Sequence, residues 1–340
     1  EARPADHALV GDLVVTQDIP LAALLVPRGI PVLDPRGEEH TMETIGERLS
    51  VNGVVALDDA LTARVGAIAE GLVADVLVGV GDPVRRGQAI ARIHSHLVHD
   101  AKAAYRAADA GIQAIQKGYT RYAANPGIVE LRAAVARNLS LMSGGRAINP
   151  DQIIISNGSK QSIFNACFSL FGPKDKVLIP TPAWVSYPQI VHLCRAEPIA
   201  VTGDPEWGLK VSVKDLEARY DKLVKGLILC SPCNPTGATY SATEIKAIAE
   251  WARTHGVWII ADEIYRRIYY GNGPAPSFLD LPDELLERVV LIYGAAKAYA
   301  MTGWRIGAAY APMPLVRAMG ALQSQTTTAA NHPAQWAAAT

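Results

Sequence analysis

The stretch YGAAKAYAMTGWRIG at residues 293–307 decides the fold, because it places a lysine directly after an apolar run of strand length, VVLIY at 289–293. Lys297 is the only lysine in this stretch, and Arg305 follows eight positions later. Four more apolar runs lie upstream: QIIIS at 152–156, KVLIP at 176–180, KGLILC at 225–230 and VWIIAD at 257–262. Helix-like stretches such as SATEIKAIAEWARTHG at 241–256 separate them. This alternation predicts an α/β fold of three layers, with helices on both faces of a mainly parallel sheet.

Polar and aromatic residues follow each of these predicted strands. In open parallel sheets, ligands bind beyond the carboxyl ends of the strands, so these residues are candidates for one common site. In chain order they are Gly158 and Ser159, Trp184, Asn234, Asp262 and Tyr265, and Lys297.

Several of these candidates have a structural explanation as well as a functional one. Gly158 and Ser159 open a helix and favour an anion there, although many α/β proteins begin a helix in this way. Trp184 stands between two prolines and suits either the core or stacking on a flat ring. Asn234, between Pro232 and Pro235, either donates to a ligand or only starts a turn.

Asp262 ends a buried strand, where a carboxylate needs a partner because unpaired burial is costly. Tyr265 comes near it if a helix starts at this point. A lysine beside a flat aromatic face, a carboxylate and an amide is the set of groups that pyridoxal phosphate requires. The amine forms a Schiff base, the carboxylate pairs with the pyridinium nitrogen, and Arg305 offers a two-pronged donor to the phosphate.

The motifs together also resemble a known family. GYTRYAANPGIVELRAAVA, SNGSKQSIFN, PAWVSYP, SPCNPTGATY, ADEIY and GAAKAYAMTGWRIG look like class I aminotransferases of the aspartate aminotransferase superfamily, fold type I, over residues 112–340. The resemblance implies a pyridoxal-phosphate-dependent transferase large domain. It also implies an enzyme that moves an amino group between an amino acid and a 2-oxo acid.

The resemblance assigns a role to each matching residue. Lys297 is the aldimine lysine and moves the proton between the substrate Cα and C4′ of the cofactor. Asp262 pairs with the ring nitrogen, Tyr265 and Asn234 hold the ring oxygen O3′, and Trp184 flanks the ring. Arg305 and the turn of Gly158, Ser159 and Lys160 hold the phosphate, and Tyr122 reaches the phosphate of a neighbouring subunit, which implies a homodimer.

Lys160 also resembles the lysine that recognises acidic side chains, which suggests aspartate or glutamate as the substrate.

Two positions near the predicted phosphate site depart from the family pattern. Gly294 and Ala296 stand where many relatives have serines, so two hydroxyl donors are missing. We also expect weak or no turnover, because the chain ends at Thr340, before the family's small domain and its substrate-binding arginine.

The composition changes near residue 110, which predicts two units, 1–110 and 111–340. All four cysteines, six tryptophans and four phenylalanines lie after this point. The first unit has the short strand-like runs of a small β-rich barrel or sandwich. Residues 45–108 resemble the lipoyl-like segment of periplasmic adaptors, the membrane fusion proteins of efflux pumps. Residues 1–101 contain no lysine, so this unit cannot carry biotin or lipoate.

Two small groups of possible metal ligands favour structural interpretations. CSPC at 230–233 fits a CxxC redox or metal site, but no second CxxC accompanies it and Pro232 and Pro235 make the loop rigid. HSHLVHD carries His94, His96 and His99, and alternation on a strand would put the first two on one face. We favour a solvated corner between strand and helix, so no metal is predicted.

The net charge of −1 indicates neither a nucleic-acid partner nor an anionic membrane. No run approaches the roughly 18 apolar residues of a membrane span. The main hypothesis is a cytoplasmic, pyridoxal-phosphate-dependent aminotransferase. The alternatives are an efflux-pump adaptor fragment, which would place the protein in the periplasm, and a chimaera without native function.

Overall fold

The computed structural model describes residues 14–15, 32–33, 72–78, 83, 85, 88–89, 91–94 and 96–340. Its contacts divide the chain into two units, residues 1–102 and 103–340. In the first unit, β1 (Val14–Val15) pairs in parallel with β2 (Val32–Leu33), and β3 (Leu72–Val76) pairs antiparallel with β4 (Ala91–His94). Residues 47–71, where the sequence predicts further strands, lie outside the described residues. The predicted boundary near residue 110 lies inside helix α3 (His96–Gln116).

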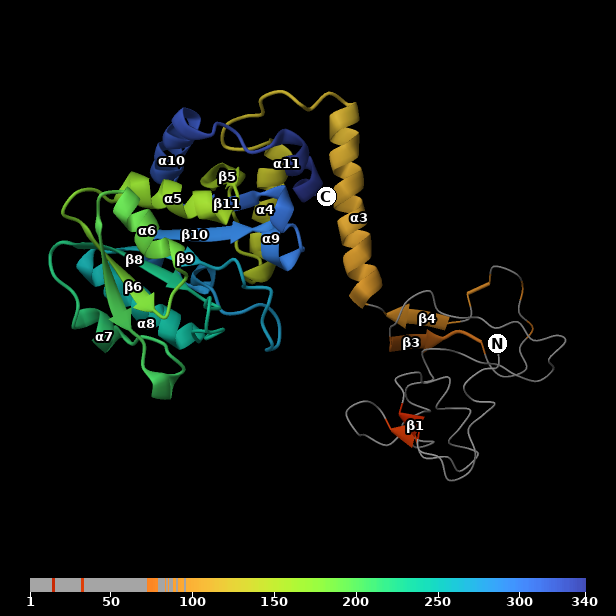
Figure 1. Cartoon of the computed structure of the whole chain (residues 1–340), viewed down its shortest axis with the longest axis horizontal. Helices are drawn as coiled ribbons and strands as arrows, with labels where there is room; N and C mark the ends of the chain where they lie inside the picture. Colours follow the sequence, from red (N-terminus) through yellow and green to blue (C-terminus); the bar gives the residue numbers. More distant parts are fainter. Residues whose placement is uncertain are drawn as a thin grey trace. The chain divides into compact units, whose positions relative to one another are not determined.

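The second unit is built on one seven-stranded sheet (Figure 1). The strands, in spatial order, are β5 (Ile153–Asn157), β11 (Ile306–Tyr310), β10 (Val289–Gly294), β9 (Trp258–Asp262), β8 (Val224–Cys230), β6 (Lys176–Thr181) and β7 (Glu197–Thr202). Only β11 runs antiparallel to its two neighbours. The α/β fold with a mainly parallel sheet is therefore confirmed.

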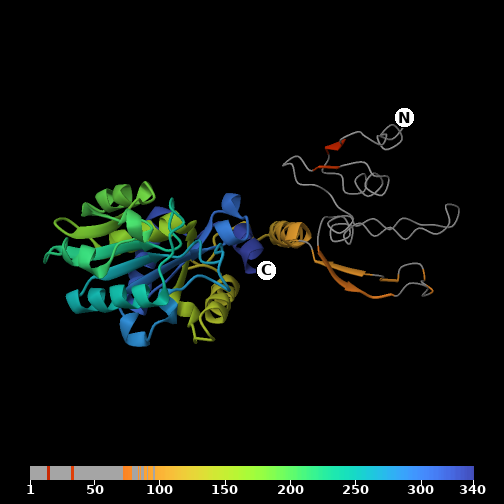
Figure 2. The ribbon, with the colours of Figure 1, turned by 90° about the horizontal axis from the view of Figure 1, so that it is seen from below.

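Helices cover both faces of this sheet (Figure 2). Alternate strand residues divide between two cores, because successive side chains of a strand point to opposite faces. One core joins the sheet to α4 (Val129–Met142), α8 (Ala242–His255) and α11 (His332–Ala339). The other joins it to α5 (Ser159–Leu170), α6 (Ser186–Leu193) and α10 (Met313–Thr326). Strands buried on both faces explain the continuous apolar runs in the sequence.

Local sequence signals fix the ends of several helices. Ser241 and Glu244 form a capping box at the start of α8, and Gly256 ends it with φ 67° in the left-handed region. The short helices α7 (Val213–Glu217) and α9 (Ala295–Ala298) complete the unit, and α9 carries Lys297.

Strands β7 and β11 were not predicted. In β11, Gly307 lies so close to the start of α5 that a Cβ atom would stand 2.2 Å from the backbone nitrogen of Ser159. The strand therefore contains small residues, Gly307, Ala308 and Ala309, which give a weak strand signal. No helix starts after Asp262: residues 264–267 form a turn, so the condition for Tyr265 to lie near Asp262 on a helix is not met.

Candidate active site

The sheet topology brings the predicted site residues to one edge. Strands β6, β8, β9 and β10 are mutually parallel, so their carboxyl ends lie together. Asp262 stands in register with Cys230 of β8 and Ile292 of β10. The loop that carries Asn234 and the helix α9 that carries Lys297 therefore leave the sheet on either side of Asp262.

Asp262 is a buried carboxylate, 3% exposed, whose hydrogen-bond partners are uncharged. The Tyr187 hydroxyl donates to its Oδ2 at 2.6 Å, and the backbone N–H of Ile264 donates to Oδ1 at 3.3 Å. Burial raises the pKa of Asp262, while these two donors oppose the rise. Within residues 103–340, no lysine, arginine or histidine forms an ion pair with it. The site thus presents a desolvated negative group that a cationic ligand atom would stabilise.

Sequence reasoning missed Tyr187 as a site residue. It lies on α6, is 2% exposed, and sits three residues after Trp184 with its ring edge against that indole, 5.5 Å between centroids. Burial raises its pKa well above the ordinary range, so it remains a hydroxyl that donates to Asp262. Its place in the PAWVSYP loop, next to the predicted Trp184, was the available signal.

Asn234, Tyr265 and Lys297 lie close together, as predicted. The Asn234 amide donates to the Tyr265 hydroxyl at 3.3 Å, and Lys297 Nζ lies 5.8 Å from the centre of the Tyr265 ring. Burial is the main cause that raises the pKa of Tyr265. Lys297 itself is exposed, so its amine is accessible to a ligand. This corner offers an amide donor, a hydroxyl and a free amine.

Arg305 and the start of α5 form a second corner. A Cβ atom on Gly158 would lie 2.6 Å from Arg305 Nη2, so only glycine lets the guanidinium approach this closely. Gly158 has φ 83°, and Arg305 itself has φ 56° in the left-handed region, a conformation that is costly for a residue with a side chain. The guanidinium and the first N–H groups of a 12-residue helix therefore converge, which is the arrangement that binds phosphate.

The last predicted site residues are Lys160, Trp184 and Tyr122. The exposed Lys160 extends its amine over Trp184, 4.8 Å from the ring centre, so these two are also together. Tyr122 is 89% exposed, and among residues 103–340 no hydrogen bond joins it to the other candidates.

The structure also bears on the possible metal site at His94 and His96. Strand β4 ends at His94 and α3 begins at His96, so the two are not on one strand as the metal reading required. The described residues contain no cluster of three or more His, Cys, Asp or Glu placed to hold a metal. Among the same residues, no helix has the length and apolar character needed to cross a membrane.

Residues 95–340 match the sequence model of aminotransferase class I and II, and residues 4–56 match the uncharacterized BCR, YaiI/YqxD family. An aspartate aminotransferase of Streptomyces avermitilis is 38% identical over 210 residues, which are 62% of this chain and 51% of that protein. A bifunctional aspartate aminotransferase and glutamate/aspartate-prephenate aminotransferase of Petunia hybrida is 41% identical over 231 residues, 68% of this chain and 48% of that protein.

A solved structure of Thermus thermophilus aspartate aminotransferase with maleate superposes with a TM-score of 0.66 at 35% identity, covering 69% of this chain and 60% of that one. The chain thus spans about half the length of the two curated relatives.

Proposed function

Since this chain belongs to the class I and II aminotransferase family, we propose that it transfers an amino group between an amino acid and a 2-oxo acid with pyridoxal 5′-phosphate. The observation that supports the proposal is the edge just described: Asn234, Asp262 and Lys297 follow or end the neighbouring strands β8, β9 and β10, and Arg305 precedes β11. When bound, this cofactor supplies a ring that accepts the electrons left on the substrate Cα after its proton departs.

The residues at this edge have the charges and the hydrogen-bond donors that the cofactor needs. Among residues 103–340 the buried Asp262 carboxylate has neutral donors only, so a protonated ring nitrogen would supply a positive partner. The Arg305 guanidinium against Gly158 offers the phosphate charge and donors. The Asn234 amide and the Tyr265 hydroxyl, which lie together, would supply donors for the ring oxygen.

In this scheme, the chain's residues orient the reactants and move one proton. Lys297 Nζ would take up the proton that leaves the substrate Cα and hold it for its return. Tyr187 keeps Asp262 in place through its 2.6 Å hydrogen bond. Trp184, half-buried at the same edge, presents a flat face that limits where a planar ring can lie.

The test is an absorption titration of the purified chain with pyridoxal 5′-phosphate. We expect a visible band at saturation that the Lys297→Ala variant lacks. The matched control is Lys225→Ala, because Lys225 is an exposed lysine whose amine donates to the backbone carbonyl of Lys222 at 2.8 Å. A wild-type chain without the band, or a band that survives in Lys297→Ala, would refute the proposal.

The substrate and the partner subunit belong to the proposal as well. Lys160 is exposed at the site edge, which supports a side-chain carboxylate, and hence aspartate or glutamate, as its ligand. Lys160→Ala should then weaken binding of aspartate more than binding of alanine, and equal weakening would contradict this assignment. Tyr122, 89% exposed, suits a role in the site of a second copy. A chain that sediments as a monomer with the cofactor bound would contradict the homodimer.

A cytoplasmic location completes the proposal, and the four free cysteines fit a reducing compartment. Processing of the chain on export to the periplasm would overturn it. The adaptor-like character of residues 45–108 stays a prediction, and the match to residues 4–56 concerns a different family. Within 45–108 the described strands are β3 and β4, and an experimental structure of this segment without a β-sandwich would contradict the likeness.

A further inference from the structure

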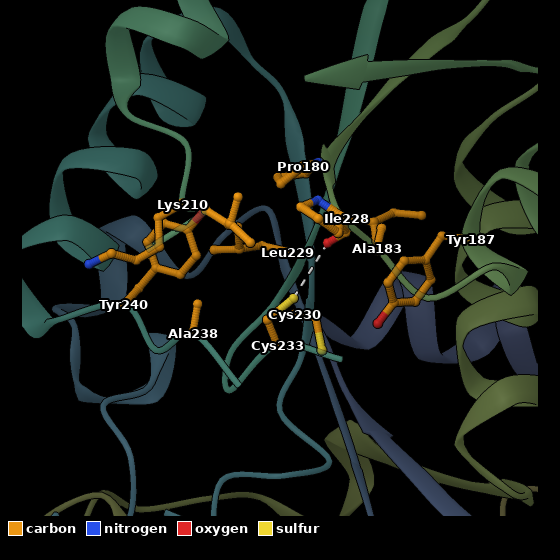
Figure 3. Close-up of a pocket in the computed structure, with 12 residues that line it drawn as sticks. Pro180, Ala183, Tyr187, Lys210, Ile228, Leu229, Cys230, Cys233, Ala238 and Tyr240 are labelled. Atoms are coloured by element: carbon orange, nitrogen blue, oxygen red, sulfur yellow. Dashed lines mark hydrogen bonds between the residues drawn. The ribbon is translucent and has the colours of Figure 1, made fainter. Parts of the chain in front are cut away.

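Two cysteines beside the candidate site have no part in the chemistry proposed above. Cys230 is the last residue of β8 and is buried, 7% exposed, whereas Cys233 lies three residues later in the loop and is partly exposed. Both line one small cavity of about 10 Å³ (Figure 3). Such a volume holds one molecule the size of water. Hydrogen peroxide is larger than water, so an oxidant would reach the pair at the partly exposed Cys233.

The polar groups around the pair favour reaction at Cys233. A hydrogen bond with Cys230, helped by the hydroxyl and backbone N–H of Thr236, lowers the pKa of Cys233 to about 6, although burial and Asp262 oppose this. The same contact and burial raise the pKa of Cys230 well above its usual range. The pair is thus asymmetric, with one sulfur that ionises readily and one that keeps its proton.

Lys210 also lines this cavity, but its ammonium does not face the two cysteines. The Lys210 ammonium points away from them (Figure 3) and binds both carboxylate oxygens of Glu244, at 2.6 and 2.9 Å. Cys233 instead directs its Sγ at the carbonyl oxygen of Pro182, 3.6 Å away, and Cys230 Sγ lies 3.2 Å from the carbonyl of Pro232. Both contacts are weak sulfur–carbonyl hydrogen bonds, which leave either sulfur able to change position.

We propose that Cys230 and Cys233 are a peroxide-reactive dithiol, in which Cys233 attacks the oxidant and Cys230 completes a reversible disulfide. In the first step, the Cys233 thiolate attacks hydrogen peroxide. An S–O bond forms, the O–O bond breaks, and the peroxide is reduced as hydroxide leaves. In the second step, Cys230 sulfur attacks the Cys233 sulfenic acid, the S–S bond forms, and its proton leaves with the departing hydroxide as water. Overall, two thiols and one peroxide give one disulfide and two waters.

The disulfide would act on the site through the loop that carries Asn234. The Cys233 N–H donates to the Ala238 carbonyl and the Gly237 N–H donates to the Cys233 carbonyl, at 2.8 Å each. Residues 233–238 therefore form a compact turn. Asn234 follows Cys233 directly and holds the Tyr265 hydroxyl from this turn. Pulling Cys233 toward Cys230 displaces the amide, so oxidation weakens pyridoxal phosphate binding. This consequence alone depends on the proposed function.

The experiment exposes the full chain to hydrogen peroxide, alkylates the remaining thiols, and maps each cysteine by peptide mass spectrometry. We expect the wild type to lose two thiols as a 230–233 crosslink that dithiothreitol reverses, with Cys233 reacting at least about tenfold faster than the buried Cys194. The Cys233→Ser variant should retain its three remaining thiols. Cys230→Ser, and Cys230→Ala as a second replacement, should instead accumulate a dimedone-reactive sulfenic acid at Cys233. Cys194→Ser, the matched control, should behave as wild type.

Three outcomes overturn the proposal: four thiols that survive peroxide, oxidation that begins at Cys194, and oxidation that joins separate chains. A titration with pyridoxal phosphate then follows on the reduced and oxidised wild type. Weaker binding after oxidation supports the link to Asn234, and equal binding removes that link. A chain that forms the disulfide but never binds the cofactor would refute the proposed function and leave the dithiol established.

Discussion

Asp262 and Glu263 are adjacent carboxylic acids, each 3% exposed, yet their surroundings differ. Glu263 is closed in by the chain itself. Ser277 Oγ donates to it at 2.6 Å, the Phe278 N–H at 2.9 Å, and Arg266, 1% exposed, lies 3.9 Å away. Asp262 has Tyr187 and one backbone N–H, with no cation of residues 103–340 beside it.

The difference indicates that Glu263 stabilises the fold, whereas Asp262 is placed to bind a ligand. The Glu263 region ties the turn after β9 to residues 275–280 and, through Arg266, to the carbonyl of Met142 at the end of α4. The buried Asp262 carboxylate has no counter-ion among residues 103–340. Buried charges are normally paired, so an unpaired one at the carboxyl edge of a sheet indicates a binding site.

The largest expected effect is on stability at the Glu263 region. Arg266→Met removes hydrogen bonds to Met142, Ser143, Ala275 and Asp280 and leaves buried acceptors unpaired. We expect the free energy of unfolding to fall by about 3–5 kcal/mol. The control is Arg267→Met, because Arg267 is exposed and should cost about 1 kcal/mol or less. Urea denaturation measures both, and equal losses would mean that Arg266 does not organise this region.

The next effect is on binding at the Asp262 region. Asp262→Asn keeps the shape but removes the charge, so affinity for pyridoxal 5′-phosphate should fall about 10- to 100-fold, the worth of a hydrogen bond to a charged group. The free energy of unfolding without cofactor should change by less than about 1 kcal/mol, because no internal ion pair is broken. Glu263→Gln is the control and should bind the cofactor as wild type does. Unchanged affinity in Asp262→Asn would place the cofactor elsewhere.

The smallest effect is a pH dependence that only one of the two regions carries. Burial raises the pKa of Glu263 to about 7, against the opposing influence of Arg266. In the unfolded chain this pKa is about 4.3, so the folded state binds the extra proton, and the contribution to stability is lost as pH rises through 7.

Wild type should therefore lose about 1–2 kcal/mol relative to Glu263→Gln between pH 6 and pH 8. Denaturation of the two proteins at several pH values measures this difference. Parallel curves would show that Glu263 does not titrate in this range.

The sequence predicted the sheet and most of the site because apolar runs and the residues after them follow directly from a parallel topology. Asp262, Asn234 and Lys297 were placed at one edge by that rule alone. Strand β11 was missed because Gly307 must be small for close contact with α5, and small residues do not signal a strand. Tyr187 was missed because its partner Asp262 lies 75 positions away, and such pairings arise only in the folded chain.

The measurement that tests the central claim most directly is a crystal structure of the chain with pyridoxal 5′-phosphate. The account predicts the ring nitrogen within about 3 Å of an Asp262 carboxylate oxygen, with the phosphate at Arg305 and the start of α5. A cofactor bound away from this edge, or one whose ring nitrogen faces a neutral group while Asp262 keeps only Tyr187 and Ile264, would contradict it.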